Sequence, residues 1–315
     1  MSEPNKLIIL SKDAAKYAEL ITRLNLRHLE FTVADTPQGA EGNIKACNII
    51  LGDPRQIKSV LGVAKRLKWV QSTWAGVDAL VDPKIRTDYI LTGVKGVFGQ
   101  MMSEYVFAYI LALERNIISV HANQQKKHWQ DMHYKTLSGR HLGVCGLGSI
   151  GRHIAQTAKH FGMEVWGYKR TFEAVAEVDR VFTDKDFSEF LALPDFMVIT
   201  LPSTPDTLHL FDESAFKAMK KTAVLINVGR GSVVSEQALV RALDAREIGG
   251  AVLDVFEKEP LTKASPLWTN PHVLITPHIS ALSFPEDIVN IFAENYRRFI
   301  SDQPLLHVID FNQGY

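Results

Sequence analysis

Residues 139–155 read GRHLGVCGLGSIGRHIA and contain the stretch that decides the fold. The apolar run at 141–145 predicts a buried strand, and Gly146, Gly148 and Gly151 form a GxGxxG pattern directly after it. In such a loop the first glycine permits a tight turn, the second lets a pyrophosphate approach the backbone, and the third lets helix and strand pack closely. The following helix begins with free N–H donors for phosphates. The stretch predicts a dinucleotide-binding unit, and the alternative is a glycine-rich turn that binds nothing.

Short apolar runs on both sides of this loop predict parallel sheets. Before it they are LIIL at 7–10, CNIIL at 47–51, WVQST at 69–73 and YILTG at 89–93; after it they are EVWGY at 164–168, DFMVIT at 195–200, AVLINV at 223–228, GAVLDV at 250–255 and VLIT at 273–276. Runs so short and apolar are typical of strands that are covered on both faces. We expect two α/β units, the second doubly wound.

The segment 99–129 joins the two series of strands. It contains no proline, and its apolar residues recur at helical spacing: Met102, Tyr105, Val106, Tyr109, Ile110, Leu113 and Ile117. The pattern predicts a long helix, which would separate two domains.

The composition and the net charge limit the kinds of partner that the protein can be expected to bind. A chain of 315 residues predicts two domains or one large one, and 46% hydrophobic with 22% charged residues is ordinary for a globular protein. Because 35 basic residues balance 35 acidic ones, no net field attracts nucleic acid or an anionic membrane. We expect a small-molecule partner, no nucleic acid and no membrane.

Several simple signals agree with a reduced, cytoplasmic protein. Cys47 and Cys145 lie inside apolar runs, where a buried free thiol is the usual occupant. The start, MSEPNKLIIL, lacks the long apolar core of a signal peptide, and the longest apolar run, 105–113, is far shorter than the roughly 20 residues that span a bilayer. Neither a zinc-type Cys/His spacing nor a Walker-type GxxxxGK[ST] is present, so no metal is expected.

The end of the second strand of the dinucleotide unit indicates the cofactor. An NAD site has Asp or Glu there, about 20 residues after the glycine loop, to accept hydrogen bonds from the ribose 2′-OH. Here the residues are Lys169, Arg170 and Thr171. A cationic pair suits the 2′-phosphate of NADP, so NADPH is favoured and NADH is possible. The alternative is a pair of solvated loop charges.

Three polar residues follow neighbouring strands, where ligands of open parallel sheets bind. They are Arg230 between two glycines, Glu259 before a proline, and His278 in TPHIS. An arginine that holds a carboxylate, a histidine that donates a proton and a carboxylate that orients the histidine are the parts needed to reduce a 2-oxo acid. Spacing alone does not choose between Glu257 and Glu259. His272 precedes its strand and so lies at the wrong end of the sheet.

In their order and spacing these motifs resemble the D-isomer-specific 2-hydroxyacid dehydrogenase family. The likeness runs from about Trp69 to Ala281 and covers KWVQSTWAGVD at 68–78, LPSTPDT at 201–207, LINVGRGSVV at 225–234, AVLDVFEKEPL at 251–261 and ITPHIS at 275–280. Within the family the chain is similar to the glyoxylate/hydroxypyruvate reductase A type, through KRT at 169–171, SPLW at 265–268, ITPHISA at 275–281 and the terminal Gly314-Tyr315. One departure is Ser280-Ala281, where the family often has a glycine, and this affects the expected pocket shape.

The resemblance implies roles and boundaries. Arg230 would be the substrate arginine, Glu259 rather than Glu257 the acid partner, and His278 the proton donor. The N–H groups of Ala75, Gly76 and Val77 would bind the substrate carboxylate, unless they form a simple strand-to-helix turn. Two Rossmann-like domains are implied: a discontinuous substrate domain, 1–98 with 283–315, and a dinucleotide domain, 99–282. The helix from Gly99 is implied to form a homodimer. The expected dinucleotide contacts are Gly146, Gly148, Ser149, Ile150, Gly151, Lys169, Arg170, Thr171, Pro202, Val228 and Asp254.

The working hypothesis is a hydride transfer from NADPH to C2 of glyoxylate, hydroxypyruvate or a similar 2-oxo acid, which gives the D-2-hydroxy acid. Two alternatives stay open. One is a dehydrogenase for bulkier 2-oxo acids, and the other is a nicotinamide-sensing binding protein.

Overall fold

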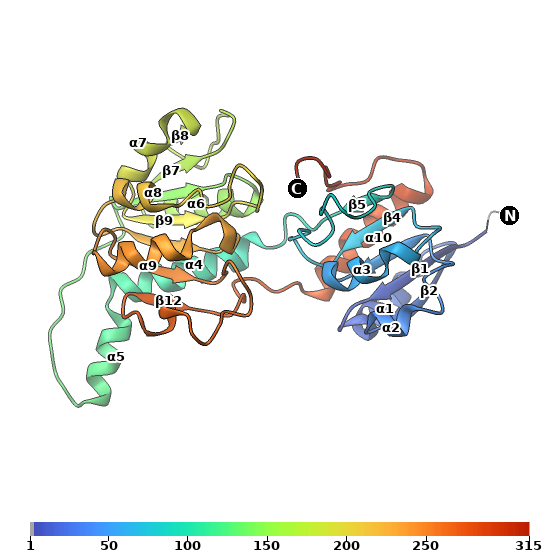
Figure 1. The fold of residues 1–315 in the computed structure, drawn as a ribbon, viewed down its shortest axis with the longest axis horizontal. Helices are drawn as coiled ribbons and strands as arrows, with labels where there is room; N and C mark the ends of the chain where they lie inside the picture. Colours follow the sequence, from blue (N-terminus) through green and yellow to red (C-terminus); the bar gives the residue numbers. More distant parts are fainter. Residues whose placement is uncertain (1–2, 315) are drawn as a thin grey trace. The chain divides into compact units, whose positions relative to one another are not determined.

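The computed structural model describes residues 3–314, so Tyr315 of the terminal pair lies outside the described residues. The chain divides into two compact units: the first 97 residues together with those from Ser283 onward, and Phe98–Leu282. Figure 1 follows the chain through both.

The first unit is built on a parallel five-stranded sheet in the order β2-β1-β3-β4-β5. Its strands are β1 Asn5–Leu10, β2 Leu29–Ala34, β3 Ile49–Gly52, β4 Trp69–Ser72 and β5 Ile90–Thr92. Its helices are α1 Ala14–Leu24, α2 Pro37–Ala40, α3 Pro54–Val60 and α10 Pro285–Ile300. The last helix comes from the C-terminal segment, which makes this unit discontinuous in sequence.

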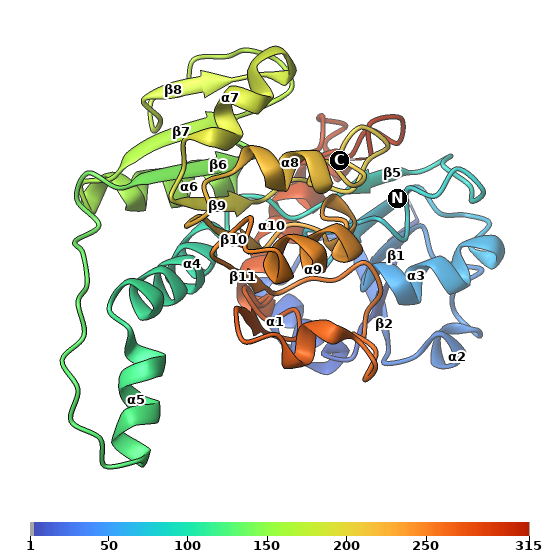
Figure 2. The ribbon, with the colours of Figure 1, turned by 60° about the vertical axis from the view of Figure 1, so that its left-hand side comes forward.

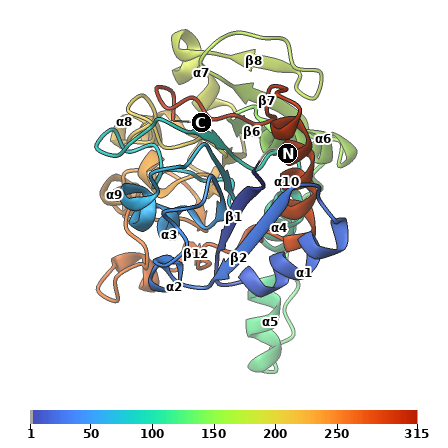
Figure 3. The same cartoon turned by 90° about the vertical axis from the view of Figure 1, so that its right-hand side faces the viewer.

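Helices cover both faces of this sheet, with α1 and α10 on one side of β1 and β2, and α2 and α3 on the other (Figure 3). Trp69 of β4 is fully buried, stacks on Phe292 of α10 with ring centroids 5.2 Å apart, and donates from Nε1 to the Thr92 hydroxyl at 2.8 Å. Burial of so large a ring with its single donor satisfied is strongly stabilising. Trp69 is therefore a core residue that ties the C-terminal helix to the sheet.

The second unit is built on a parallel seven-stranded sheet in the order β12-β11-β10-β9-β6-β7-β8. Its strands are β6 His141–Cys145, β7 Glu164–Tyr168, β8 Arg180–Phe182, β9 Phe196–Ile199, β10 Val224–Asn227, β11 Gly250–Leu253 and β12 Val273–Ile275. Its helices are α4 Gly99–Glu114, α5 Ile117–Gln125, α6 Ser149–His160, α7 Phe187–Ala192, α8 Glu213–Ala218 and α9 Glu236–Asp244. Figure 2 shows α8 and α9 on one face and α6 on the other. The unit is doubly wound, as the sequence predicted.

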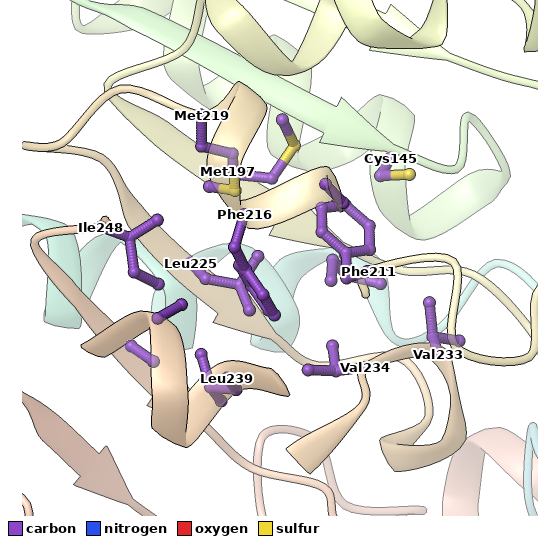
Figure 4. Close-up of a cluster of buried hydrophobic side chains, with 14 of the residues drawn as sticks. Cys145, Met197, Phe211, Phe216, Met219, Leu225, Val233, Val234, Leu239 and Ile248 are labelled. Atoms are coloured by element: carbon purple, nitrogen blue, oxygen red, sulfur yellow. The ribbon is translucent and has the colours of Figure 1, made fainter. Parts of the chain in front are cut away.

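Alternation along the strands explains why the strand sequences are apolar throughout. In β10, Leu225 packs into the cluster under α8 and α9 (Figure 4), whereas the next residue, Ile226, packs into the cluster under α4 and α6. Successive side chains point to opposite faces, so a strand covered on both sides needs an apolar residue at every position. Burial of each such side chain stabilises the fold by roughly 1.5–3 kcal/mol.

The structure corrects the predicted long helix and adds two strands. The helix of 99–129 is broken at Asn116, whose φ is 54°, and α5 ends before Trp129, which is 95% exposed. The Asn116 side chain donates to the carbonyl of His133 at 2.9 Å, which fixes this corner. The strands β2 and β8 lie at sheet edges, where several of their residues are exposed. Their sequences therefore lack the continuous apolar run that identifies a central strand.

Candidate active site

The three glycines of the loop after β6 meet three different physical demands. Gly146 has φ 107°, a conformation that side chains disfavour, and its N–H donates to the carbonyl of Tyr168 at 2.9 Å. A Cβ on Gly151 would lie 1.9 Å from the carbonyl oxygen of Gly146, so only glycine lets α6 pack against the loop. A Cβ on Gly148 would meet no protein atom within 4 Å, which leaves the space above this backbone open to a ligand. These features fit a bound pyrophosphate.

The loop lies at the point where the strand order reverses, because β6 is flanked by β7 on one side and β9 on the other. Thr200, directly after β9, donates from its hydroxyl to the carbonyl of Gly146 at 2.8 Å. Pro202 follows, half-buried, with its carbonyl accepting from the Thr207 hydroxyl at 2.7 Å. Such a switch point is where doubly wound sheets bind nucleotides.

The start of α6 presents donors to this space. Gly148 stands at the N-cap and carries no side chain, so no cap closes the first turn. Ser149 is exposed and Ile150 is half-buried, whereas Val228, at the end of β10, is buried with its N–H bonded to the carbonyl of Ile199. The first two residues are therefore accessible, and Val228 belongs to the core beneath the site.

Both cations at the end of β7 have carboxylate partners. Lys169 pairs with Glu173, and Arg170 Nη1 lies 3.1 Å from Asp206 Oδ2. The hydrogen bond from Lys169 holds the pKa of Glu173 below its usual range. Thr171 is exposed beside them. The expected phosphate cations are thus gathered at the rim of the glycine loop, within an ion-pair network that the sequence analysis did not anticipate.

Close backbone approaches explain why Arg230 stands between two glycines. A Cβ on Gly229 would lie 2.7 Å from the carbonyl oxygen of Leu201, and one on Gly231 would lie 1.8 Å from the carbonyl carbon of Phe256. The Arg230 side chain is half-buried, and its Nη1 donates to the carbonyl of Gly229 at 2.7 Å. The loop that carries the arginine is pressed between the loops that follow β9 and β11.

His278 and Glu259 are brought together across two strand ends. His278 Nδ1 lies 2.9 Å from Glu259 Oε2, and Glu259 Oε1 accepts from the backbone N–H of Phe256 at 3.3 Å. The histidine side chain is 49% exposed and the carboxylate 23% exposed. A ring held through Nδ1 leaves Nε2 available for proton transfer.

The competing residues lie elsewhere. Glu257 Oε1 accepts from the backbone N–H of Glu236 at 2.8 Å and lies 3.2 Å from His209 Nε2. His272 is exposed and precedes β12. Geometry therefore separates Glu259 from Glu257, which spacing alone could not do.

Asp254, expected as a dinucleotide contact, hydrogen-bonds the segment that follows β12. It is fully buried at the end of β11. Its Oδ1 accepts from the Thr276 hydroxyl and from the N–H of Ile279, the latter at 2.8 Å. Its Oδ2 accepts from the N–H of Ser280 at 2.9 Å. Its carbonyl accepts the N–H of His278 at 2.8 Å. Asp254 thus holds the segment that carries the histidine. A lone charge inside the apolar run GAVLDV was the signal for this role.

The same network reaches α4 through a residue that the sequence pattern assigned only to the apolar face of a helix. The Tyr105 hydroxyl lies 2.7 Å from the Thr276 hydroxyl, which in turn donates to Asp254. Burial raises the pKa of Tyr105 well above its usual range, so the phenol stays protonated. Ser280 is buried, and neither it nor Ala281 has a positive φ, so this backbone needs no glycine where the family often has one.

The turn of the first unit that was expected to bind a carboxylate offers three backbone donors. The Ser72 hydroxyl accepts from the N–H of Trp74 at 3.0 Å and donates to its carbonyl at 2.7 Å, which shapes the turn. Within residues 3–314, the N–H groups of Ala75, Gly76 and Val77 donate to no other group. They are therefore available as donors to a ligand.

No helix among residues 3–314 is both long and apolar enough to cross a membrane. No group of three or more His, Cys, Asp or Glu side chains in the same range is placed to hold a metal ion.

A glycine loop at a switch point, with a histidine paired to a carboxylate at the same edge of the sheet, is typical of nicotinamide-dependent oxidoreductases. Comparison with known proteins gives the family. Residues 107–280 match the model of the D-isomer specific 2-hydroxyacid dehydrogenase, NAD binding domain. The chain belongs to the D-isomer-specific 2-hydroxyacid dehydrogenase family.

Individual relatives agree with this assignment. The chain is 30% identical to glyoxylate/hydroxypyruvate reductase A of Yersinia enterocolitica, over 82% of this chain and 85% of that protein. It is 34% identical to glyoxylate reductase of Pyrococcus horikoshii, over 77% and 76% of the two chains. Among solved structures, a family member from Aeromonas salmonicida is 46% identical with a TM-score of 0.94, covering 98% of this chain and 100% of that one. The NADPH-dependent glyoxylate/hydroxypyruvate reductase of Sinorhizobium meliloti, solved with NADP and sulfate, is 28% identical with a TM-score of 0.90, covering 99% and 100%.

Proposed function

We propose that this protein reduces a small 2-oxo acid, glyoxylate or hydroxypyruvate, to the 2-hydroxy acid, D-configured where C2 is chiral, with NADPH as reductant. The observation that carries the proposal is the 2.9 Å pairing of His278 with Glu259 at the same sheet edge as the glycine loop and Arg230. The names of the relatives support the substrate class, and solved relatives that hold NADP support the cofactor.

The proton comes from His278 in this mechanism. Glu259 accepts from Nδ1 and fixes the orientation of the ring, so that Nε2–H can protonate the developing alkoxide. The N–H of Phe256 holds the other carboxylate oxygen and so keeps Glu259 aimed at the ring. When bound, the nicotinamide would supply the hydride to C2 of the substrate.

Arg230 and the backbone N–H groups of Ala75, Gly76 and Val77 are assigned to the substrate. The guanidinium would hold the carboxylate and polarise the carbonyl, and the three N–H groups would hydrogen-bond the carboxylate. In this assignment residues 1–98 with 283–315 bind the substrate. Residues 99–282 bind the dinucleotide, with Gly146, Gly148, Ser149 and Gly151 on the pyrophosphate and Lys169 with Arg170 on the 2′-phosphate.

The test is the initial rate of NADPH and NADH oxidation with glyoxylate, hydroxypyruvate, pyruvate and phenylpyruvate. We expect turnover of the two small polar acids with NADPH preferred, and Arg170→Ala should raise KM for NADPH far more than for NADH. Activity on bulky acids alone would keep the family and reject the substrate. Tight NADPH binding without turnover of any acid would favour a sensing protein.

We also propose that the protein is a cytoplasmic homodimer. Both cysteines are free and buried, as in a reducing compartment. The segment formed by α5 and residues 126–134 projects from its own sheet (Figure 1) and exposes Ile118 at 46% and Trp129 at 95%, apolar surface that a second copy could cover. Light scattering should give twice the chain mass, and Ile118→Asp with Trp129→Ala should give the monomer. Phe172→Ala, which removes a ring that is 70% exposed and lies outside this segment, is the matched control.

A further inference from the structure

The two cations assigned to the 2′-phosphate are held by carboxylates that come from opposite sides of the switch point. Glu173, in the loop after β7, pairs with Lys169. Asp206, in the loop after β9, approaches Arg170 Nη1 to 3.1 Å. Both carboxylates therefore lie against the groups that would have to contact a phosphate.

Glu173 is engaged by a second cation that belongs to the glycine loop. Arg152 of α6 places Nη2 3.2 Å from Glu173 Oε1, while its Nε donates to the carbonyl of Leu147 at 3.2 Å. The hydrogen bond from Lys169, followed by the charges of Lys169 and Arg152, lowers the pKa of Glu173, so it is ionised at neutral pH. A negative charge is thus fixed at the rim where the 2′-phosphate of NADP would have to enter.

We propose that Glu173 and Asp206 are counter-ions that compete with the 2′-phosphate and so set how strongly the protein prefers NADP over NAD; this inference rests on the proposed function. A phosphate must displace the carboxylates from Lys169 and Arg170 or share these cations with them. A dinucleotide with a free 2′-OH leaves the pairs intact. The Arg170 and Asp206 side chains are 55% and 70% exposed, and those of Lys169 and Glu173 are 23% and 57% exposed. Ion pairs that are open to solvent on at least one side are weak enough to exchange with a ligand.

The test uses Glu173→Gln and Asp206→Asn, which remove each charge and keep the shape. Dissociation constants for NADP⁺ and NAD⁺ are measured by calorimetry on the whole protein. Each variant should shift the NADP⁺/NAD⁺ affinity ratio toward NADP⁺ by about two- to five-fold, as expected for exposed pairs. Glu173→Gln should have the larger effect because it releases two cations. At 0.5 M NaCl the shifts should shrink, because salt screens exposed charges.

The matched control is Glu189→Gln, which breaks the exposed pair between Glu189 and Arg180, whose closest atoms are 2.7 Å apart, away from the glycine loop. It should leave the ratio as in the wild type, and melting temperatures show that all variants fold. A wild-type ratio, or a shift toward NAD⁺, in both Glu173→Gln and Asp206→Asn would overturn the inference. Arg170→Ala distinguishes a failure of the 2′-phosphate assignment from a failure of the counter-ion inference. If it binds NADP⁺ as the wild type does, the 2′-phosphate assignment fails and the inference falls with it; if it weakens NADP⁺ and the carboxylate variants change nothing, only the inference fails.

Discussion

His278 has a backbone conformation that residues other than glycine rarely adopt, with φ 56°. Such a conformation costs of order 1 kcal/mol or more and persists only where the surroundings over-determine it. Here Asp254 accepts the N–H groups of His278, Ile279 and Ser280 through its carbonyl and carboxylate. The strain is therefore held by one buried residue, and it directs the imidazole toward Glu259.

Replacing His278 by glutamine tests the proton donor. We expect kcat to fall by roughly 10² to 10⁴, the usual contribution of a general acid, because the amide cannot supply a proton. NADPH binding, followed by fluorescence, should persist because the glycine loop is untouched. Unchanged turnover would remove His278 from the mechanism.

Asp254→Asn tests the residue that holds this segment. The amide NH₂ would face one of the donors that the carboxylate now accepts, and an unsatisfied buried group costs about 1–3 kcal/mol. We expect a lower melting temperature together with a reduced kcat. Wild-type stability and kcat would show that the segment is held by other contacts.

At the scale of elements, the parallel sheet explains why residues far apart in sequence meet. Five strands of the second sheet end at one edge, and each is followed by a part of the site. Pro202 follows β9 and the glycine loop follows β6. Arg230, Glu259 and His278 follow β10, β11 and β12 in that order. Their order across the sheet follows from the strand pairing, with β6 beside β9 and β11 beside β12. The hydrogen bonds between the strands therefore position the site residues, and the glycines let the loops that carry them approach one another.

The same substitution should act differently at two glycines of one loop. Gly151→Ala places a Cβ 1.9 Å from the carbonyl oxygen of Gly146, so it should cost about 1–3 kcal/mol of stability and distort the loop. Gly148→Ala meets no protein atom and has an ordinary φ of −75°, so the fold should keep its melting temperature. It should nevertheless weaken NADP⁺ binding by about tenfold or more, because the methyl group blocks the approach of the pyrophosphate. Equal melting curves together with equal affinities for both variants would contradict this model of the loop.

At the scale of the whole molecule, buried thiol and phenol groups make the free energy of unfolding depend on pH in the alkaline range. Burial raises the pKa of the Cys47 thiol to about 12 and that of the Tyr89 phenol to about 12. In the unfolded chain these groups ionise near pH 8.5 and 10, so between those values and about pH 12 the folded state binds more protons. The free energy of unfolding must therefore fall as pH rises through this window.

Urea unfolding at pH 8.0 and at pH 10.5 measures this dependence. Cys47 alone should contribute a loss of about 1 kcal/mol per pH unit above its unfolded pKa. Cys47→Ala is expected to be less stable at pH 8.0, because it leaves a cavity, but to lose less stability on going to pH 10.5. A pH slope equal to that of the wild type would show that Cys47 ionises in the folded chain.

The sequence by itself determined the doubly wound architecture, the glycine loop and the set of polar residues at the strand ends. These depend on local rules: an apolar residue at every position of a doubly covered strand, glycine where no side chain fits, and polar residues directly after each strand. Only the tertiary structure decided which residues pair. It placed Glu259 rather than Glu257 beside His278, turned Asp254 toward the segment after β12, broke the long helix at Asn116 and brought Asp206 to Arg170. Each of these outcomes is a contact between segments distant in sequence, and the packing of the whole sheet sets those contacts.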